Sequence, residues 1–149
     1  MEVKIENATI TLLDKYYEIE EQCFDQEAFT KSQISYLLTD YNTIALMAKT
    51  NSDIAGFVIA QIEVEENTEF GHIITINVAP NHRRQGTATK LLQKIENLLK
   101  QKGITKCRLE VREDNKHAIK LYQKLGYQTV GLLENYYGKK HGLYLKKIL

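Results

Sequence analysis

The chain has 149 residues, of which 43% are hydrophobic and 26% charged, with a single proline. This composition is typical of a globular protein and excludes a disordered or fibrous chain. Twenty basic and nineteen acidic residues give a net charge of +1, which excludes a global field that would hold the chain on nucleic acid or an anionic membrane.

The length predicts one domain over residues 1–149, because a chain of this size buries enough surface for one core. Cys23 and Cys107 lack the paired spacing of a zinc site or a disulfide scaffold, and we expect both to be reduced core residues. Neither a signal region nor a membrane-spanning apolar stretch is evident. A cytoplasmic location, with no membrane or nucleic-acid partner, is therefore expected.

The first half of the chain predicts a strand, two helices and a hairpin. Alternating residues indicate a strand over 4–11, and Thr30 is placed to cap the second, short helix. Two strands are expected within 43–64, separated by turn formers at 50–53, and the acidic stretch 63–69 is expected to form the next turn. The first helix is expected to have Asp14 as its cap and an apolar side of Tyr17, Ile19, Cys23 and Phe24.

The second half alternates strands and helices. Apolar residues occupy both odd and even positions of 70–78, which indicates a central strand that is covered on both faces. Further strands are expected over 106–111, 127–133 and 142–148. Two helices end at Gly103 and Gly126, and Asn115 caps the second. The order predicts a mixed sheet covered by helices. The apolar faces of these helices are Ala88, Leu91, Leu92, Ile95 and Leu99, and then Ala118, Leu121, Tyr122 and Leu125.

A basic loop with one glycine lies between the central strand and the first of these helices. It reads Arg83-Arg84-Gln85-Gly86-Thr87-Ala88. A helix N-terminus offers unpaired N–H groups, glycine lets the backbone approach an anion, and the arginines add charge, so the loop suits a phosphate group. The alternative is a helix start with two solvated arginines. The phosphate-binding lysine motif and the dinucleotide glycine pattern are both missing, which disfavours a nucleotide-binding domain.

The loop and the segments after it resemble the GNAT acetyltransferase superfamily, in particular its RimI-type and archaeal Ard-like protein N-terminal acetyltransferases. This resemblance implies an α/β (α+β) fold with a mixed, mostly antiparallel sheet of about seven strands and about four helices. It also implies acetyl-CoA as co-substrate, with no metal. The residues that carry it are Arg83, Gly86 and Ala88, then Leu109-Glu110-Val111-Arg112, Asn115, Ala118, Leu121, Tyr122, Leu125, Gly126 and Tyr127, and Asn135-Tyr136-Tyr137.

The resemblance also implies a donor site. The backbone of Ile76, Asn77 and Val78 would line the pantetheine and thioester, and the Val78 N–H would donate to the thioester oxygen. Asn115 would contact the coenzyme, besides capping its helix. The loop that would hold the pyrophosphate consists of Arg83, Arg84, Gln85, Gly86, Thr87 and Ala88.

Two catalytic residues are implied in the same way. Tyr122 would be the general acid for the coenzyme thiolate, and Glu110 would accept the amine proton directly or through water. The alternative for Tyr122 is a core tyrosine on an apolar helix face. The alternative for Glu110 is a carboxylate paired with Arg112 or Arg108. His72 would join a water chain to the amine, or simply pack.

The implied acceptor is the N-terminal amine of a protein or peptide, contacted by Phe29 in the loop 24–29 and by Tyr136 and Tyr137. This chain carries Gly138-Lys139-Lys140-His141-Gly142 where relatives usually carry acidic residues, and Phe24-Asp25-Gln26-Glu27 replaces their loop pattern. A small amine, a polyamine or a lysine side chain therefore stays open as acceptor. A non-catalytic coenzyme-binding module touching an acidic partner through the lysines near 139 and 146 also stays open, as does action alone, as a homodimer or with an auxiliary subunit.

Overall fold

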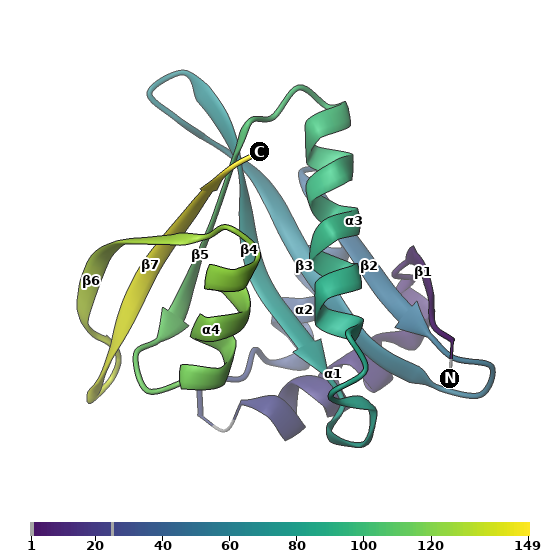
Figure 1. Cartoon of the computed structure of the whole chain (residues 1–149). Helices are drawn as coiled ribbons and strands as arrows, with labels where there is room; N and C mark the ends of the chain where they lie inside the picture. Colours follow the sequence, from purple (N-terminus) through teal and green to yellow (C-terminus); the bar gives the residue numbers. More distant parts are fainter. Residues whose placement is uncertain (1, 25) are drawn as a thin grey trace.

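The computed structural model of the chain describes residues 2–24 and 26–149. Within them, strands and helices follow one another in the predicted order (Figure 1). The elements are β1 (Lys4–Asn7), η1 (Ile10–Leu12), α1 (Leu13–Cys23), α2 (Lys31–Thr39), β2 (Thr43–Lys49), β3 (Ile54–Glu65), β4 (Thr68–Val78), η2 (Pro80–His82), α3 (Thr87–Gln101), β5 (Lys106–Arg112), α4 (Lys116–Lys124), β6 (Gln128–Tyr137) and β7 (Lys140–Ile148).

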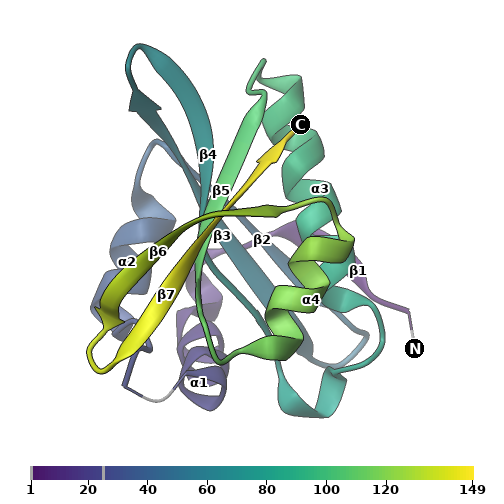
Figure 2. The ribbon, with the colours of Figure 1, turned by 60° about the vertical axis from the view of Figure 1, so that its left-hand side comes forward.

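The seven strands form one mixed sheet in the order β1-β2-β3-β4-β5-β7-β6. Every neighbouring pair is antiparallel except β4 and β5, which run parallel. Helices α3 and α4 cover one face, and α1 and α2 cover the other face over β2, β3 and β4 (Figures 1 and 2). The predicted α/β architecture with a mostly antiparallel sheet of seven strands is confirmed.

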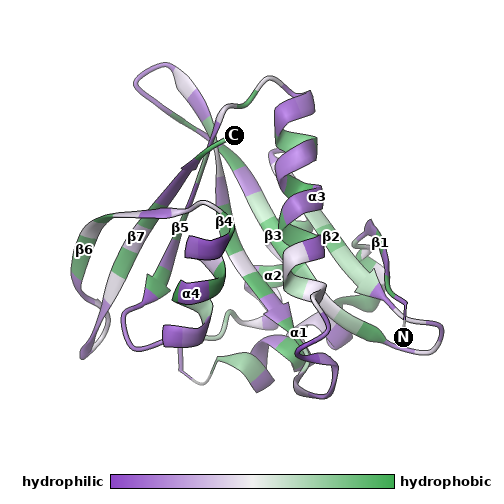
Figure 3. Cartoon of the chain, in the orientation of Figure 1, coloured by the Kyte–Doolittle hydropathy of each residue, from purple (hydrophilic) through white to green (hydrophobic). Residues whose placement is uncertain are grey.

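Helix α3 packs on the sheet through one apolar face. Leu91, Leu92, Ile95 and Leu99 are fully buried and recur at helical spacing. Burying a side chain of this kind stabilises the fold by about 1.5–3 kcal/mol. In Figure 3 the hydrophobic colour of α3 lies toward the sheet and the hydrophilic colour away from it. This packing fixes where α3 begins, next to the carboxyl end of β4.

Strands β4 and β5 separate after a short contact. Their parallel pairing is confined to Gly71 with Cys107 and His72 with Arg108. The register with β3 shifts beside Ile74, which is the mark of a β-bulge that bends the strand. Beyond this point the two strands diverge (Figure 1). One edge of β4 up to Val78 therefore offers backbone groups without a partner strand.

Helix α1 differs from the prediction in its cap and in its buried face. Its N-cap is Leu12, without a side-chain hydrogen bond, and Asp14 lies inside the first turn. Tyr16 is buried in place of Tyr17, together with Ile19 and Glu20. The buried face follows the helical spacing i, i+3, i+4, and the chain enters α1 through η1, which shortens β1. The capping of α2 by Thr30 is confirmed by a complete capping box.

The acidic stretch after position 62 is mostly strand. β3 continues through Glu65, and the turn is limited to Glu66 and Asn67, which have φ values of 52° and 64°. Two residues at positive φ suffice for a tight hairpin turn whose twist matches the strands. The prediction of a turn over 63–69 is therefore wrong, and Glu63 projects from the sheet.

Cys23 and Cys107 are both free thiols, and Cys107 is fully buried while Cys23 is half-buried. None of the described helices combines the length and apolar character that crossing a lipid bilayer requires.

Candidate active site

The loop before α3 has the features of an anion site. Gly86 adopts a left-handed conformation with φ of 76°, and a Cβ added there would meet no atom within 4 Å. The first N–H groups of α3 lack intrahelical partners. Thr87 is 2% exposed, and its Oγ1 has no hydrogen-bond partner among the described residues. An open helix start with an orphaned hydroxyl fits a phosphate group.

The two arginines of the loop differ in conformation. Arg83 folds back, with Nε donating to the Val78 carbonyl at 3.2 Å and Nη2 reaching Cys23 Sγ at 3.4 Å. Arg84 adopts φ of 65° and is exposed, as is Gln85, while Ala88 is half-buried. Arg83 thus has contacts within the protein, and the pyrophosphate contacts of both arginines remain predictions.

The segment of β4 that is predicted to line the thioester borders the gap between β4 and β5. Ile76, Asn77 and Val78 all lie beyond the last pair that joins these strands. The Asn77 side chain is 2% exposed and turns toward α1, while its Oδ1 has no hydrogen-bond partner among the described residues. The backbone of these residues is thus placed along the gap, as the donor-site prediction requires.

Glu20 is a buried carboxylate that the sequence reasoning missed. It is 1% exposed and accepts hydrogen bonds from Thr75 Oγ1 at 2.9 Å, Asn77 Nδ2 at 2.7 Å and the Phe29 backbone N–H at 3.1 Å. Burial raises its pKa, although these donors oppose the shift. Glu20 therefore ties the loop after α1 to β4. Its helical spacing from Tyr16 could have revealed it as a residue of the buried face.

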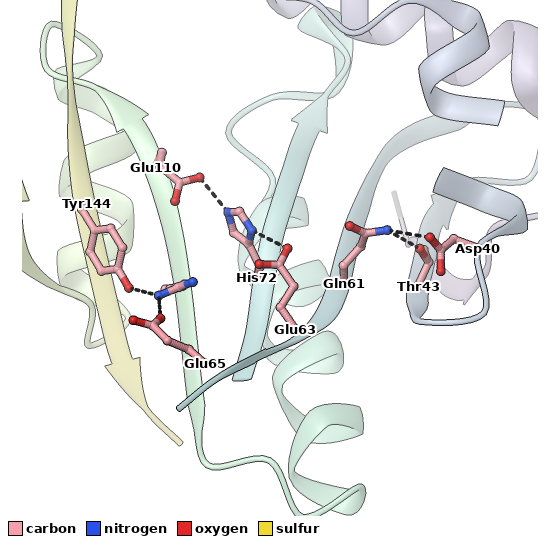
Figure 4. Close-up of polar contacts among 9 residues, drawn as sticks. Asp40, Thr43, Gln61, Glu63, Glu65, His72, Glu110 and Tyr144 are labelled. Carbon is pink, nitrogen blue, oxygen red and sulfur yellow. Dashed lines mark hydrogen bonds and ion pairs between the residues drawn. The ribbon is translucent and has the colours of Figure 1, made fainter. Parts of the chain in front are cut away.

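A carboxylate, an imidazole and a second carboxylate form a row across three neighbouring strands. His72 Nδ1 lies 2.8 Å from Glu63 Oε2, and His72 Nε2 lies 2.7 Å from Glu110 Oε1. Figure 4 shows the ring between the two carboxylates. Burial alone would lower the pKa of His72, but the hydrogen bonds and charges of Glu110 and Glu63 outweigh it and raise the pKa. His72 thus contacts Glu110 directly.

Glu110 is not paired with either neighbouring arginine. Arg108 Nη1 donates to Glu65 at 2.6 Å and to the Tyr144 hydroxyl at 2.7 Å. Arg112 donates to Glu27 at 2.8 Å and to Asp114 at 2.7 Å and 3.0 Å. The alternative in which Glu110 serves an arginine ion pair is wrong, because both arginines have other carboxylate partners.

Tyr122 lies on the apolar face of α4, as both interpretations of it require. The residue is 8% exposed, and burial raises its pKa. Its ring packs edge-on against Tyr127 at 5.9 Å between centroids. The Tyr127 hydroxyl donates to Glu96 at 2.8 Å, whereas the Tyr122 hydroxyl forms no hydrogen bond within the described part of the chain. The hydroxyl oxygen is not among the fully buried atoms that lack a partner, so it is accessible at the surface of the fold, although most of the side chain is buried.

The end of β6 comes close to these groups. Burial raises the pKa of Tyr137, and the charges of Tyr136, Glu110, Tyr122 and Glu27 add to the shift. Burial and Glu110 also raise the pKa of Tyr136. The two tyrosine rings pack edge-on at 4.9 Å.

The remaining predicted site residues are placed as follows. The Phe29 side chain packs against the core beneath α1 and α2, and Asp25 of its loop lies outside the described residues. Asn115 caps α4, its Oδ1 accepting from the Ala118 N–H at 3.2 Å. In residues 2–24 and 26–149, no three His, Cys, Asp or Glu side chains gather in an arrangement suited to a metal ion.

Comparison with known proteins agrees with this geometry. The sequence model described as "Acetyltransferase (GNAT) family" matches residues 9–127. An N-alpha-acetyltransferase of Sulfurisphaera tokodaii is 28% identical over 97% of this chain and 91% of its own. A [ribosomal protein bS18]-alanine N-acetyltransferase of Escherichia coli is 36% identical over 62% of this chain and 60% of its own. The structure of Ard1 from Thermoplasma volcanium superposes with a TM-score of 0.90 at 22% identity, covering 100% and 99% of the two chains.

Proposed function

The chain belongs to the acetyltransferase (GNAT) family, and we propose that it transfers the acetyl group of acetyl-CoA to the N-terminal α-amine of proteins. The observation that carries this proposal is that the pairing of β4 with β5 ends at His72 and Arg108, where His72 contacts Glu110, so that a candidate base lies beside the free edge of β4. Tyr122 of α4 and Tyr137 of β6 lie within electrostatic range of one another, and Tyr137 lies within electrostatic range of Glu110. The names of two relatives, an N-alpha-acetyltransferase and a ribosomal-protein-alanine N-acetyltransferase, support the class of acceptor.

Acetyl-CoA enters this proposal as the donor substrate, which brings the acetyl group as an activated thioester. Thr87 and the N–H groups that follow Gly86 would hold its pyrophosphate, assisted by Arg84. The free edge of β4 at Ile76 to Val78 would pair with its pantetheine, since that edge lacks a partner strand. Asn115 would combine its capping role with a coenzyme contact.

Glu110 would deprotonate the acceptor. An α-ammonium group has a pKa near 8, so about a tenth of the acceptor is already neutral at pH 7, and Glu110 would take up the proton directly or through water as the nitrogen attacks. The Oε1 atom of Glu110 contacts His72, and the carboxylate retains Oε2 for the acceptor. The neutral amine would then attack the thioester carbon, while the Val78 N–H would stabilise the developing oxyanion. The second proton that nitrogen loses as the amide forms replaces the one that Tyr122 gives to the thiolate, directly or through water.

Tyr122 would protonate the departing thiolate. Burial raises the pKa of this phenol, which makes it a weaker acid than the thiol it would generate. The proton must therefore move as the carbon–sulfur bond breaks, before a free thiolate forms. A hydroxyl without another hydrogen-bond partner is free to point at the sulfur.

The acceptor peptide would lie between Tyr136 and Tyr137 on one side and the loop containing Phe29 on the other. Arg112 tethers that loop to β5, because its guanidinium donates to Glu27. We place the activity in the cytoplasm, in one domain acting alone, as a homodimer or with an auxiliary subunit. A small amine, a polyamine or a lysine side chain is the alternative acceptor, and coenzyme binding without catalysis is the alternative to an enzyme.

A panel of acceptors tests the proposal. Coenzyme release from acetyl-CoA is measured with short peptides of varied first residue, with polyamines, and with N-terminally blocked peptides that contain lysine. Transfer to free peptide N-termini alone is the expected result. Transfer confined to polyamines or blocked peptides would reassign the acceptor, and acetyl-CoA binding without any transfer would favour a non-catalytic module.

A further inference from the structure

We infer that Glu63 is a positioning residue that keeps both ring nitrogens of His72 protonated and so directs the ring's Nε2–H to Glu110. This inference rests on the proposed role of Glu110 as the base. It concerns a strand, β3, that contributes no other residue to the proposed reaction. Glu63 acts through His72 and does not itself touch the acceptor.

The three side chains leave the sheet on the same face. Gly71 faces α3, because a Cβ placed on it would meet the Leu99 side chain at 2.5 Å, so its neighbour His72 points to the opposite face. Leu109 and Val111 are buried in the core beneath α3, so Glu110 between them also points away. The contacts at 2.8 Å and 2.7 Å thus join three adjacent strands.

Counting protons assigns the charge of the ring. A carboxylate oxygen only accepts hydrogen bonds, and a neutral imidazole has one N–H and one lone pair. A neutral His72 would therefore turn a lone pair toward one carboxylate, which is repulsive unless that carboxylate is protonated. An imidazolium ring donates to Glu63 and Glu110 at once, in two charge-assisted hydrogen bonds. The raised pKa of His72 agrees with this state.

Glu63 and Glu110 stabilise the protonated ring, because the other polar and charged side chains nearby have different partners. Gln61 of β3 donates to Asp40 and Thr43, away from the ring. Arg108 of β5 stands beside His72 in the parallel register, but it is paired with Glu65 and stacked 3.5 Å from the Phe70 ring centroid. The charge of Glu110 contributes to the raised pKa of Tyr136 and of Tyr137 on β6.

The three side chains differ in exposure and in their position along the row, and their proposed roles differ accordingly. The side chains of His72 and Glu110 are 18% and 15% exposed, and that of Glu63 is 35% exposed. Glu63 lies at the outer end of the row, where its charge stabilises the imidazolium. Glu110 lies at the gap, where the N–H from His72 fixes Oε1 and leaves Oε2 for the acceptor. The row carries one net negative charge, which also attracts an ammonium group.

The imidazole of His72 can be titrated directly by NMR in the protein without substrate. We expect Glu63→Gln to shift the titration of His72 to lower pH, because an amide side chain removes the charge while keeping a hydrogen bond. The matched control is Glu65→Gln, two residues along on the same face of β3, whose carboxylate contacts Arg108. It should leave the His72 titration in place. An unchanged titration in Glu63→Gln, or an equal shift in both variants, overturns the inference.

The pH profile of acetyl transfer provides the second measurement. With peptide acceptors, the alkaline limb of kcat/KM in Glu63→Gln should move to lower pH together with the ring titration. A uniform loss of activity at every pH would instead indicate a structural role and overturn the inference. The NMR titration needs no substrate, so it tests the link between Glu63 and His72 independently of acetyl transfer. If peptides are not acetylated, that result contradicts the proposed function and leaves the outcome of the titration unaffected.

Discussion

Replacement of Tyr122 by phenylalanine separates a catalytic hydroxyl from a core tyrosine. The hydroxyl has no hydrogen-bond partner within the described residues, in a side chain that is 8% exposed. Its removal should leave the free energy of unfolding unchanged or raise it by at most about 1 kcal/mol, since no bond is lost. General acid catalysis contributes roughly 10²–10⁴-fold to a rate. We therefore expect kcat to fall by about that factor, while acetyl-CoA affinity changes little.

The two quantities are measured by urea unfolding and by steady-state release of coenzyme with a peptide acceptor. Tyr127→Phe is the matched control, because its ring packs against Tyr122 and its hydroxyl donates to the buried Glu96. That variant should lose about 1–3 kcal/mol of stability and keep most of its turnover. Unchanged kcat in Tyr122→Phe, or a fall that is matched by lost stability, would refute the assignment of the general acid.

Three further changes test the donor site, the acceptor loop and the buried carboxylate. Gly86→Glu should abolish acetyl-CoA binding in calorimetry, because it places a negative charge at the helix start, whereas Gly86→Asn, which tolerates the left-handed conformation, should retain binding. Arg112→Gln should raise KM for peptides and leave acetyl-CoA affinity unchanged, because it releases Glu27 and its loop; equal changes in both constants would contradict this. The raised pKa of Glu20 means that its contribution to stability is complete below the unfolded-state pKa and is lost as pH rises through the folded-state pKa. The free energy of unfolding should therefore fall less with rising pH, from acid to neutral, in Glu20→Gln than in the parent, and parallel curves would argue against it.

The loop before α3 could be predicted from the sequence because local signals determine it. Gly86 lies between an apolar strand and a strongly periodic helix, and the structure places it at the N-cap of α3 in the left-handed conformation. The caps at Thr30 and Asn115 likewise depend on residues three positions away. Interactions of such short range leave a pattern that one sequence reveals.

The groups around His72 could not be predicted in the same way, because they come together through strand register. Glu63 and Glu110 are 9 and 38 residues from His72 in the chain. The acidic stretch 63–69 moreover predicts a turn, because charged residues near a hairpin are usually solvated, so the sequence does not indicate Glu63 as a strand residue. Glu20 was missed for a related reason, because its partners Thr75 and Asn77 are 55 and 57 residues away.

The proposed donor site and the proposed acceptor site are built from different parts of the fold. The groups proposed to hold acetyl-CoA follow one continuous segment, from Ile76 to Ala88, whose geometry is set by the packing of α3. The groups proposed to meet the acceptor come from β5, the end of β6 and the loop after α1, which are joined by side-chain contacts such as Arg112 with Glu27. Such contacts can change residue by residue without disturbing the loop before α3. The basic turn after Tyr137 is therefore compatible with an unaltered donor site, and differences in acceptor preference are expected to arise on that side of the gap.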